Sequence, residues 1–197
     1  GNEYVSAETT VEDLLCHRVG LGTFSGDVIW YKSEKTPEEI IRRAAHVPEQ
    51  FSFRDGYGYT NLMFITAGEV IKVVTGNPWE DYVNQNFIQP LDMQNTVVSI
   101  KDLSDNAATP HKPTLEKGTM PSVWASWDNS SAAGGIISSS SDMAKWMMMN
   151  LNGGKWDGKT YLEKEQQNLL WTPHNIYKLS ERSKESLPGR HFAGYGL

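Results

Sequence analysis

The sequence predicts a mainly helical domain, and three observations support this fold class. Capped segments with apolar residues at helical spacing recur between residues 9 and 171. The regular alternation of strands and helices that is typical of a parallel sheet is absent from the pattern. The hydrophobic fraction is 39%, and 197 residues suffice to bury a sizeable core. We therefore expect residues 1–197 to form a single domain.

The first helices are predicted from their capping residues. Thr36-Pro37-Glu38-Glu39 is a capping box with proline at the first helical position, and Ile40, Ile41 and Ala44 supply its apolar face. Thr9 to Asp13 offer a similar start, followed by Leu14 and Leu15. Both segments should therefore begin helices.

The longest helix is expected from Asn61 to Thr75. Its apolar residues recur at helical spacing and would share one face. They are Met63, Ala67, Val70, Ile71 and Val74. Gly76 should end this helix, because glycine readily takes the left-handed conformation.

The second half of the chain is predicted to contain three further helices. Pro78 opens one that ends before Pro90, another follows Ser138–Ser141, and a third covers Glu163–Trp171. The predicted apolar stripe of the middle helix consists of Met143, Trp146, Met147 and Leu151. Residues 96–129 are interpreted as a long loop with a short strand at Thr96-Val97-Val98, and the tail from His191 alternates like the start of a strand.

Composition excludes several classes of function. The net charge is −6 and the basic residues are scattered, so no nucleic-acid partner is expected. No apolar run approaches the length of a membrane span. The single cysteine, Cys16, excludes an internal disulfide, and the five histidines lack the spacing of metal ligands. We expect no cofactor and no metal.

One short motif contains side chains that could take part in catalysis. Tyr59-Thr60-Asn61 follows a Gly/aromatic loop where the longest helix begins, so the phenol and the amide can point into one cleft. Such a triplet also arises by chance, and on the motif alone a packed tyrosine beside a capping asparagine is the better explanation. Its sequence context favours the functional interpretation.

Four segments resemble, in order, the β-lactamase-related serine hydrolases, the superfamily of class C β-lactamases, penicillin-binding proteins and esterases. They cover most of residues 8–153, and Gly194-Tyr195-Gly196-Leu197 resembles a later strand start of that family. The segments are Thr10–Leu21, Tyr59-Thr60-Asn61, Trp79–Thr96 and Ala133–Trp146.

The resemblance implies the helical lobe of the β-lactamase/transpeptidase-like α/β fold, incomplete in this sequence, with residues 176–197 leading toward a missing α/β lobe. It also implies acyl-enzyme chemistry on ester, amide or β-lactam-like carbonyls. In that chemistry Tyr59 would be the catalytic general base or proton relay, and Asn61 would bind the substrate's amide or ester group. Export to the periplasm or the medium is implied by the same resemblance.

The family's Ser-x-x-Lys nucleophile motif is missing from this sequence. Thr114-Leu115-Glu116-Lys117 has the right spacing but carries threonine, in a loop on the wrong side of Tyr59, and we reject it. The Lys/His-x-Gly motif is missing too. We therefore expect an internal fragment that is inactive alone and that self-associates through an exposed apolar patch.

Two rival interpretations stay open. The first is a non-catalytic module that keeps the lactamase-like fold and binds a ligand in its cleft. The second is an unrelated helical interaction domain, which the ordered set of segments disfavours. Five further residues receive structural interpretations: His17 caps or hydrogen-bonds within its helix, Trp124 and Trp127 anchor loops or the core rather than line a cleft, and Gly134-Gly135 permit close backbone packing.

Overall fold

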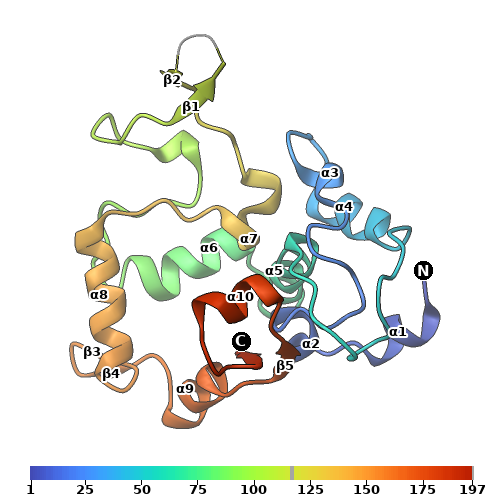
Figure 1. Cartoon of the computed structure of the whole chain (residues 1–197). Coiled ribbons are helices and arrows are strands. Elements are labelled where there is room, and N and C mark those ends of the chain that lie inside the picture. Colours follow the sequence, from blue (N-terminus) through green and yellow to red (C-terminus); the bar gives the residue numbers. More distant parts are fainter. Residues whose placement is uncertain (116–117, 197) are drawn as a thin grey trace.

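The computed structural model describes residues 1–115 and 118–196, and helices recur along its length (Figure 1). Helices account for 44% of the chain and strands for 12%. The helices are α1 (Glu3–Glu8), α2 (Val11–Leu15), α3 (Asp27–Trp30), α4 (Pro37–Ala44), α5 (Asn61–Thr75), α6 (Trp79–Val83), α7 (Ser131–Gly134), α8 (Ser140–Leu151), α9 (Lys164–Trp171) and α10 (Glu181–Ser186). A π-helix spans Asn84–Ile88, and 3₁₀ helices span Ile100–Asp102 and Asp128–Ser130.

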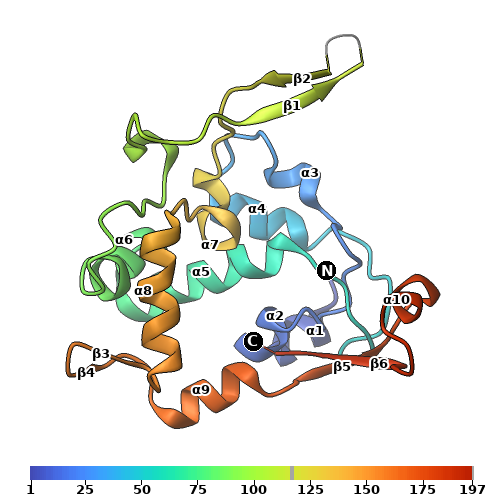
Figure 2. The same ribbon diagram turned by 60° about the vertical axis from the view of Figure 1, so that its left-hand side comes forward.

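The strands of the described residues form three antiparallel pairs. In register, His111 pairs with Pro121, Lys155 with Thr160, and Asn175 with Tyr195. The strands are β1 (His111–Thr114), β2 (Gly118–Pro121), β3 (Lys155–Trp156), β4 (Lys159–Thr160), β5 (Asn175–Lys178) and β6 (Phe192–Tyr195). The β1–β2 hairpin projects from the rest of the molecule in both ribbon views (Figures 1 and 2).

Helix α5 organises the main hydrophobic core and has the predicted bounds. Thr60 caps its first turn, and Gly76 ends it with φ of 78°. The core cluster joins residues 14–65 around this helix: Leu14, Val19, Leu21, Trp30, Ile40, Leu62, Met63 and Ile65. Full burial of a side chain such as Leu62 contributes about 1.5–3 kcal/mol to stability.

The buried face of α5 differs from the predicted one. Met63 is buried as expected. Leu62 and Ile65 are more deeply buried than Met63, and Val74 is 77% exposed. The reason is a close approach at Gly68, where an added Cβ would lie 2.5 Å from Cβ of Ala132 in α7. Only a residue without a side chain allows α7 to pack this near, and that contact orients the helix.

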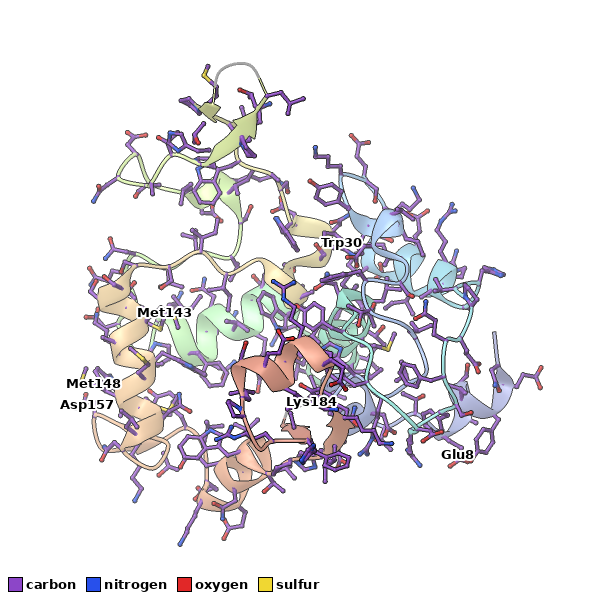
Figure 3. The ribbon with its side chains drawn as sticks, viewed as in Figure 1. Glu8, Trp30, Met143, Met148, Asp157 and Lys184 are labelled. Carbon is purple, nitrogen blue, oxygen red and sulfur yellow. The ribbon has the colours of Figure 1, made fainter. Side chains whose placement is uncertain are left out.

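The predicted apolar stripe of α8 was wrong in part: Trp146 packs against the cluster of Ile88, Leu91, Met93 and Met149, but Met147 and Leu151 do not. Met149 is fully buried against Leu91, whereas Met147 and Leu151 are 53% and 81% exposed. Asp142 decides the orientation, since its buried carboxylate accepts hydrogen bonds from the Asn95 backbone N–H at 2.7 Å and from the hydroxyl of Thr96 at 2.9 Å. Met149 lies two turns after Asp142 and therefore faces the same way. Figure 3 shows Met143 and Met148 on the same helix, 38% and 49% exposed.

Several predicted boundaries are confirmed. The capping boxes at Thr10 and Thr36 are both present, α6 follows Pro78, and α9 follows Glu163. The predicted strand at Thr96-Val97-Val98 is reduced to a single bridge between Val97 and Ile137. The β1–β2 hairpin within residues 96–129 was not predicted. The other helices and strands that were not predicted are α1, α3, α7, α10, β3, β4 and β5.

The C-terminal hairpin packs against the N-terminal part of the chain. The side-chain amide of Asn175 donates to the carbonyls of Cys16 and Gly56, each at 3.0 Å, and Tyr177 stacks on Tyr57 with ring centroids 4.6 Å apart. Whether residues 176–197 lead toward another lobe, and whether residues 1–197 form one domain, stay predictions. Among the described helices, none has the length and apolar character needed to cross a membrane.

Candidate functional site

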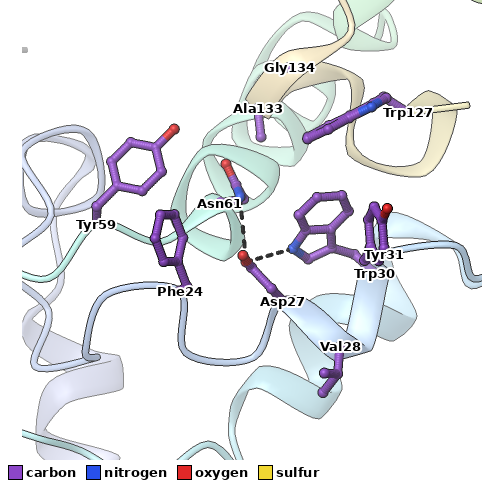
Figure 4. Close-up of a pocket in the computed structure, with 10 residues that line it drawn as sticks. All are labelled: Phe24, Asp27, Val28, Trp30, Tyr31, Tyr59, Asn61, Trp127, Ala133 and Gly134. Atoms are coloured by element: carbon purple, nitrogen blue, oxygen red, sulfur yellow. Dashed lines mark hydrogen bonds between the residues drawn. The ribbon is translucent and has the colours of Figure 1, made fainter. Parts of the chain in front are cut away.

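Tyr59 and Asn61 line the same cavity, as the motif predicted. Tyr59 is half-buried at the end of the extended segment before α5, and Asn61 is the first residue of that helix. The cavity has a volume of about 520 Å³ (Figure 4). Its lining residues are Phe24, Asp27, Val28, Trp30, Tyr31, Tyr59, Asn61, Trp127, Ala133 and Gly134.

His17 positions the segment that carries Tyr59. Its Nδ1 accepts a hydrogen bond from the Thr60 backbone N–H at 3.3 Å, and its carbonyl accepts one from Gly58 N–H at 3.1 Å. The imidazole also lies against the Tyr59 ring, with centroids 4.8 Å apart. The interpretation that His17 caps or hydrogen-bonds within its helix holds for its backbone alone, whose N–H donates to the Leu14 carbonyl of α2 at 3.3 Å. The residue itself lies beyond α2 with φ of 58°, and its side chain contacts a segment more than forty residues away.

Gly58 is required for this close packing. A Cβ at this position would lie 1.9 Å from the carbonyl oxygen of Leu21, so a larger residue would displace the Tyr59 segment. On the other side, the Phe24 backbone N–H donates to the Tyr59 carbonyl at 2.7 Å. Backbone contacts from two loops therefore fix the position of Tyr59 independently of its own side chain.

The neutral state of His17 predicts an acid-sensitive fold. Burial lowers the pKa of the imidazole from 6.5 to about 4, and Nδ1 can accept the Thr60 hydrogen bond only without a proton. The unfolded chain binds this proton more readily, so the free energy of unfolding should fall by about 3 kcal/mol as pH drops from about 6.5 to about 4. Chemical denaturation across this range measures it. His46→Gln, at an exposed histidine, should leave the slope unchanged, whereas an unchanged slope in His17→Asn would contradict the assignment.

Asn61 is held by an acidic residue that sequence analysis missed. Its side-chain amide donates to Asp27 Oδ1 at 3.4 Å, and the Trp30 indole N–H donates to the same oxygen at 2.9 Å (Figure 4). Asp27 begins the one-turn helix α3, and Trp30 ends it. An aspartate three residues before a tryptophan is a common pattern on helices. Nothing in the local sequence therefore connects Asp27 and Trp30 to Asn61, which lies thirty-four positions after Asp27.

The second tryptophan of the cavity, Trp127, was interpreted as a loop or core anchor. It does pack against the core, with its ring centroid 4.7 Å from that of Trp30, but it also lines the cavity. An added Cβ on Gly134 would lie 3.0 Å from the Trp127 ring, and one on Gly135 would lie 2.7 Å from Ser131 Cα. The prediction of close packing at these two glycines is confirmed.

The described residues offer few other candidates for catalysis or metal binding. Of the rejected Thr114–Lys117 motif, Thr114 lies in β1, while Glu116 and Lys117 fall outside the described residues. Within residues 1–115 and 118–196, no three histidine, cysteine or acidic side chains are grouped so that they could hold a metal ion.

Comparison with known proteins gives a consistent result. The family model described as "Beta-lactamase" matches residues 2–191. An unguisins hydrolase of Aspergillus violaceofuscus is 31% identical over 160 residues, which cover 75% of this chain and 28% of that protein.

Solved structures share the fold at lower sequence identity. The D-amino acid amidase of Ochrobactrum anthropi SV3, in complex with D-phenylalanine, superposes with a TM-score of 0.73 at 22% identity, covering 97% of this chain and 54% of the amidase. An octameric penicillin-binding protein homologue from Pyrococcus abyssi gives 0.72 at 22% identity, covering 95% and 42%. The chain thus spans about half the length of these structures and less of the curated relative.

Proposed function

The chain belongs to the beta-lactamase family, and we propose that its protein is a serine hydrolase that forms an acyl-enzyme with ester, amide or β-lactam-like carbonyls. One observation carries the proposal: Tyr59 and Asn61, the two residues that match the family's Tyr-x-Asn element, line one cavity of suitable size. The hydrolase and amidase names of its relatives support the same reaction class.

In this proposal, Tyr59 transfers the proton between the nucleophile and the leaving group. Hydrogen bonds to His17 and Phe24 hold the backbone on both sides of Tyr59, so the ring has little freedom to leave the cavity. Asn61 presents its side-chain carbonyl to the substrate, because its amide N–H already donates to Asp27. A preorganised donor and acceptor pair of this kind lowers the barrier by avoiding reorganisation during reaction.

The nucleophile would come from residues outside this sequence, since no serine of the 197 residues has lysine three positions later. Acyl transfer requires that serine, its base and an oxyanion hole, each of which contributes orders of magnitude in rate. We therefore expect the isolated 197-residue chain to show no turnover of a chromogenic ester or a chromogenic cephalosporin, whereas the full-length protein hydrolyses at least one. Turnover by the isolated chain would contradict the assignment of the nucleophile. Binding without turnover by the full-length protein would favour a ligand-binding module instead.

We also propose that the full-length protein is exported and that the isolated chain self-associates. Export rests on the family resemblance, and fractionation of cells that express the full-length protein tests it. Self-association of the isolated chain is supported by the exposed apolar residues Met147, Met148 and Leu151 on α8, and by the octameric state of one relative. Sedimentation over a range of concentrations distinguishes a monomer from an assembly.

A further inference from the structure

The cavity beside Tyr59 combines a carboxylate with aromatic walls. Asp27 is half-buried at the cavity, between Asn61 and Trp30 (Figure 4). The aromatic residues around it are Phe24, Trp30, Tyr31, Tyr59 and Trp127. Among the described residues that line the cavity, Asp27 is the one with a charge at neutral pH.

The Asp27 carboxylate has no cationic partner within the described chain. No lysine, arginine or histidine side chain of residues 1–115 and 118–196 forms a salt bridge with it. Its two hydrogen bonds, from Trp30 and Asn61, both end on Oδ1, so Oδ2 keeps its capacity to accept. A neutral amide at this position could hold the same two donors. A carboxylate beside apolar walls costs free energy unless a cation pairs with it.

The walls are suited to the same kind of ligand. The rings of Trp30 and Trp127 lie 4.7 Å apart at an angle of 42°, and the Tyr31 ring lies 5.7 Å from Trp30 in an edge-on arrangement. The faces of such rings attract cations through their quadrupoles, and tryptophan does so most strongly. Trp30 is 3% exposed and packs in the core, so the half-buried Trp127 is the indole of this pair that a ligand can reach. A carboxylate and an indole that line one space recognise a substituted ammonium group better than an anion or a neutral alkyl chain.

We propose that this cavity binds the cationic amine of the substrate, through Asp27 and the half-buried ring of Trp127. The substrates are then carbonyl compounds that carry a protonated amine near the scissile bond, with an apolar group that fits the remaining volume. This inference rests on the proposed hydrolase function for the identity of the ligand as substrate, but the cation site itself does not depend on turnover.

Equilibrium binding to the full-length protein tests the site. Benzylamine, cationic at neutral pH, should bind at least about tenfold more tightly than the neutral benzyl alcohol. Asp27→Asn keeps an acceptor for Trp30 and Asn61 while it removes the charge, and it should abolish this preference. Asp105→Asn, which removes an exposed carboxylate elsewhere, should leave the preference intact. Equal binding of both probes, or an unchanged preference in Asp27→Asn, would overturn the proposal.

Kinetics separate this inference from the proposed function. For the full-length protein, Asp27→Asn should raise KM for phenylalanine p-nitroanilide about tenfold more than it raises KM for the N-acetyl derivative, which lacks the cationic amine. If the protein hydrolyses neither compound but still prefers benzylamine, the cation site stands and the hydrolase assignment fails for these amides. If it hydrolyses both with equal KM, and Asp27→Asn changes neither value, the hydrolase stands and the cation site is refuted.

Discussion

Replacing Tyr59 by phenylalanine should lower kcat of the full-length protein by about 10²- to 10⁴-fold, the usual contribution of a positioned proton-transfer group. The substitution removes one oxygen and keeps the ring that packs against His17 and Phe24. Since backbone hydrogen bonds hold this segment, the cavity should keep its shape and KM should change little. Initial rates with a chromogenic ester, combined with thermal unfolding, measure both effects.

Tyr161→Phe is the matched control for this experiment. Tyr161 packs near Phe87 against the cluster of Ile88, Leu91, Met93 and Met149 and does not line the cavity. Its variant should therefore retain the activity of the unsubstituted protein. If Tyr59→Phe also retains full activity, Tyr59 has no role in proton transfer and serves only as a packed aromatic residue.

The largest expected effect on stability belongs to Asp13. Replacing it by alanine should reduce the free energy of unfolding by about 3 kcal/mol, because it removes the capping carboxylate of α2 and one charged partner of Arg18, whose side chain is 18% exposed. Arg54 is 42% exposed and contributes less. The carboxylate is fully buried and accepts from Arg18 Nε at 2.5 Å and from Arg54 Nη2 at 2.7 Å. Thr10 also donates its backbone N–H to it at 2.9 Å. Urea denaturation of the Asp13→Ala chain, beside Asp105→Ala as an exposed control, measures the difference.

The pH dependence of the same residue provides a second check. Burial alone would raise the pKa of Asp13, but hydrogen bonds from Arg54, Thr10 and Arg18 hold it well below its ordinary value. The stability from this carboxylate is therefore present above its unfolded pKa, near 4, and is lost as pH falls toward the folded value. Asp13→Ala should lack this acid-dependent loss. A variant that is as stable as the unsubstituted chain would show that Arg18 and Arg54 find other partners.

Arg18 connects the hydrogen bonds around Asp13 to parts of the chain beyond α2. Its guanidinium also donates to Glu12 at 2.6 Å and to the His174 carbonyl at 2.8 Å. It thereby links the N-terminal helices to the segment that precedes β5. These residues are distant in sequence and carry no motif, so only the folded chain shows that one carboxylate connects them.

Local chemistry accounts for the features that the sequence predicted correctly. The helix starts at Thr10 and Thr36 depend on a capping side chain and a residue three positions later, and the end at Gly76 depends on one left-handed residue. Such interactions span a few residues, so a linear pattern contains them completely. Tyr59 and Asn61 were found in the same way, from a short motif in a recognisable context.

The hairpin β1–β2 lacked any such signal. Its first strand, His111-Lys112-Pro113-Thr114, has no alternating apolar residues, and both strands are largely exposed. Backbone pairing between the strands holds it, and backbone pairing leaves no mark on the side-chain pattern. The loop interpretation of residues 96–129 failed there for this reason.

By itself the sequence predicted the starts of α2, α4 and α6, both ends of α5 and the family, and it singled out Tyr59 and Asn61. The tertiary structure alone decided which faces of α5 and α8 are buried, that His17 holds the Tyr59 segment, and that Asp27 enters the cavity beside Asn61. Contacts such as these join residues thirty or more positions apart. Their energies depend on how whole helices approach one another, through the space at Gly68 and the hydrogen bonds of Asp142, and no local preference encodes that approach.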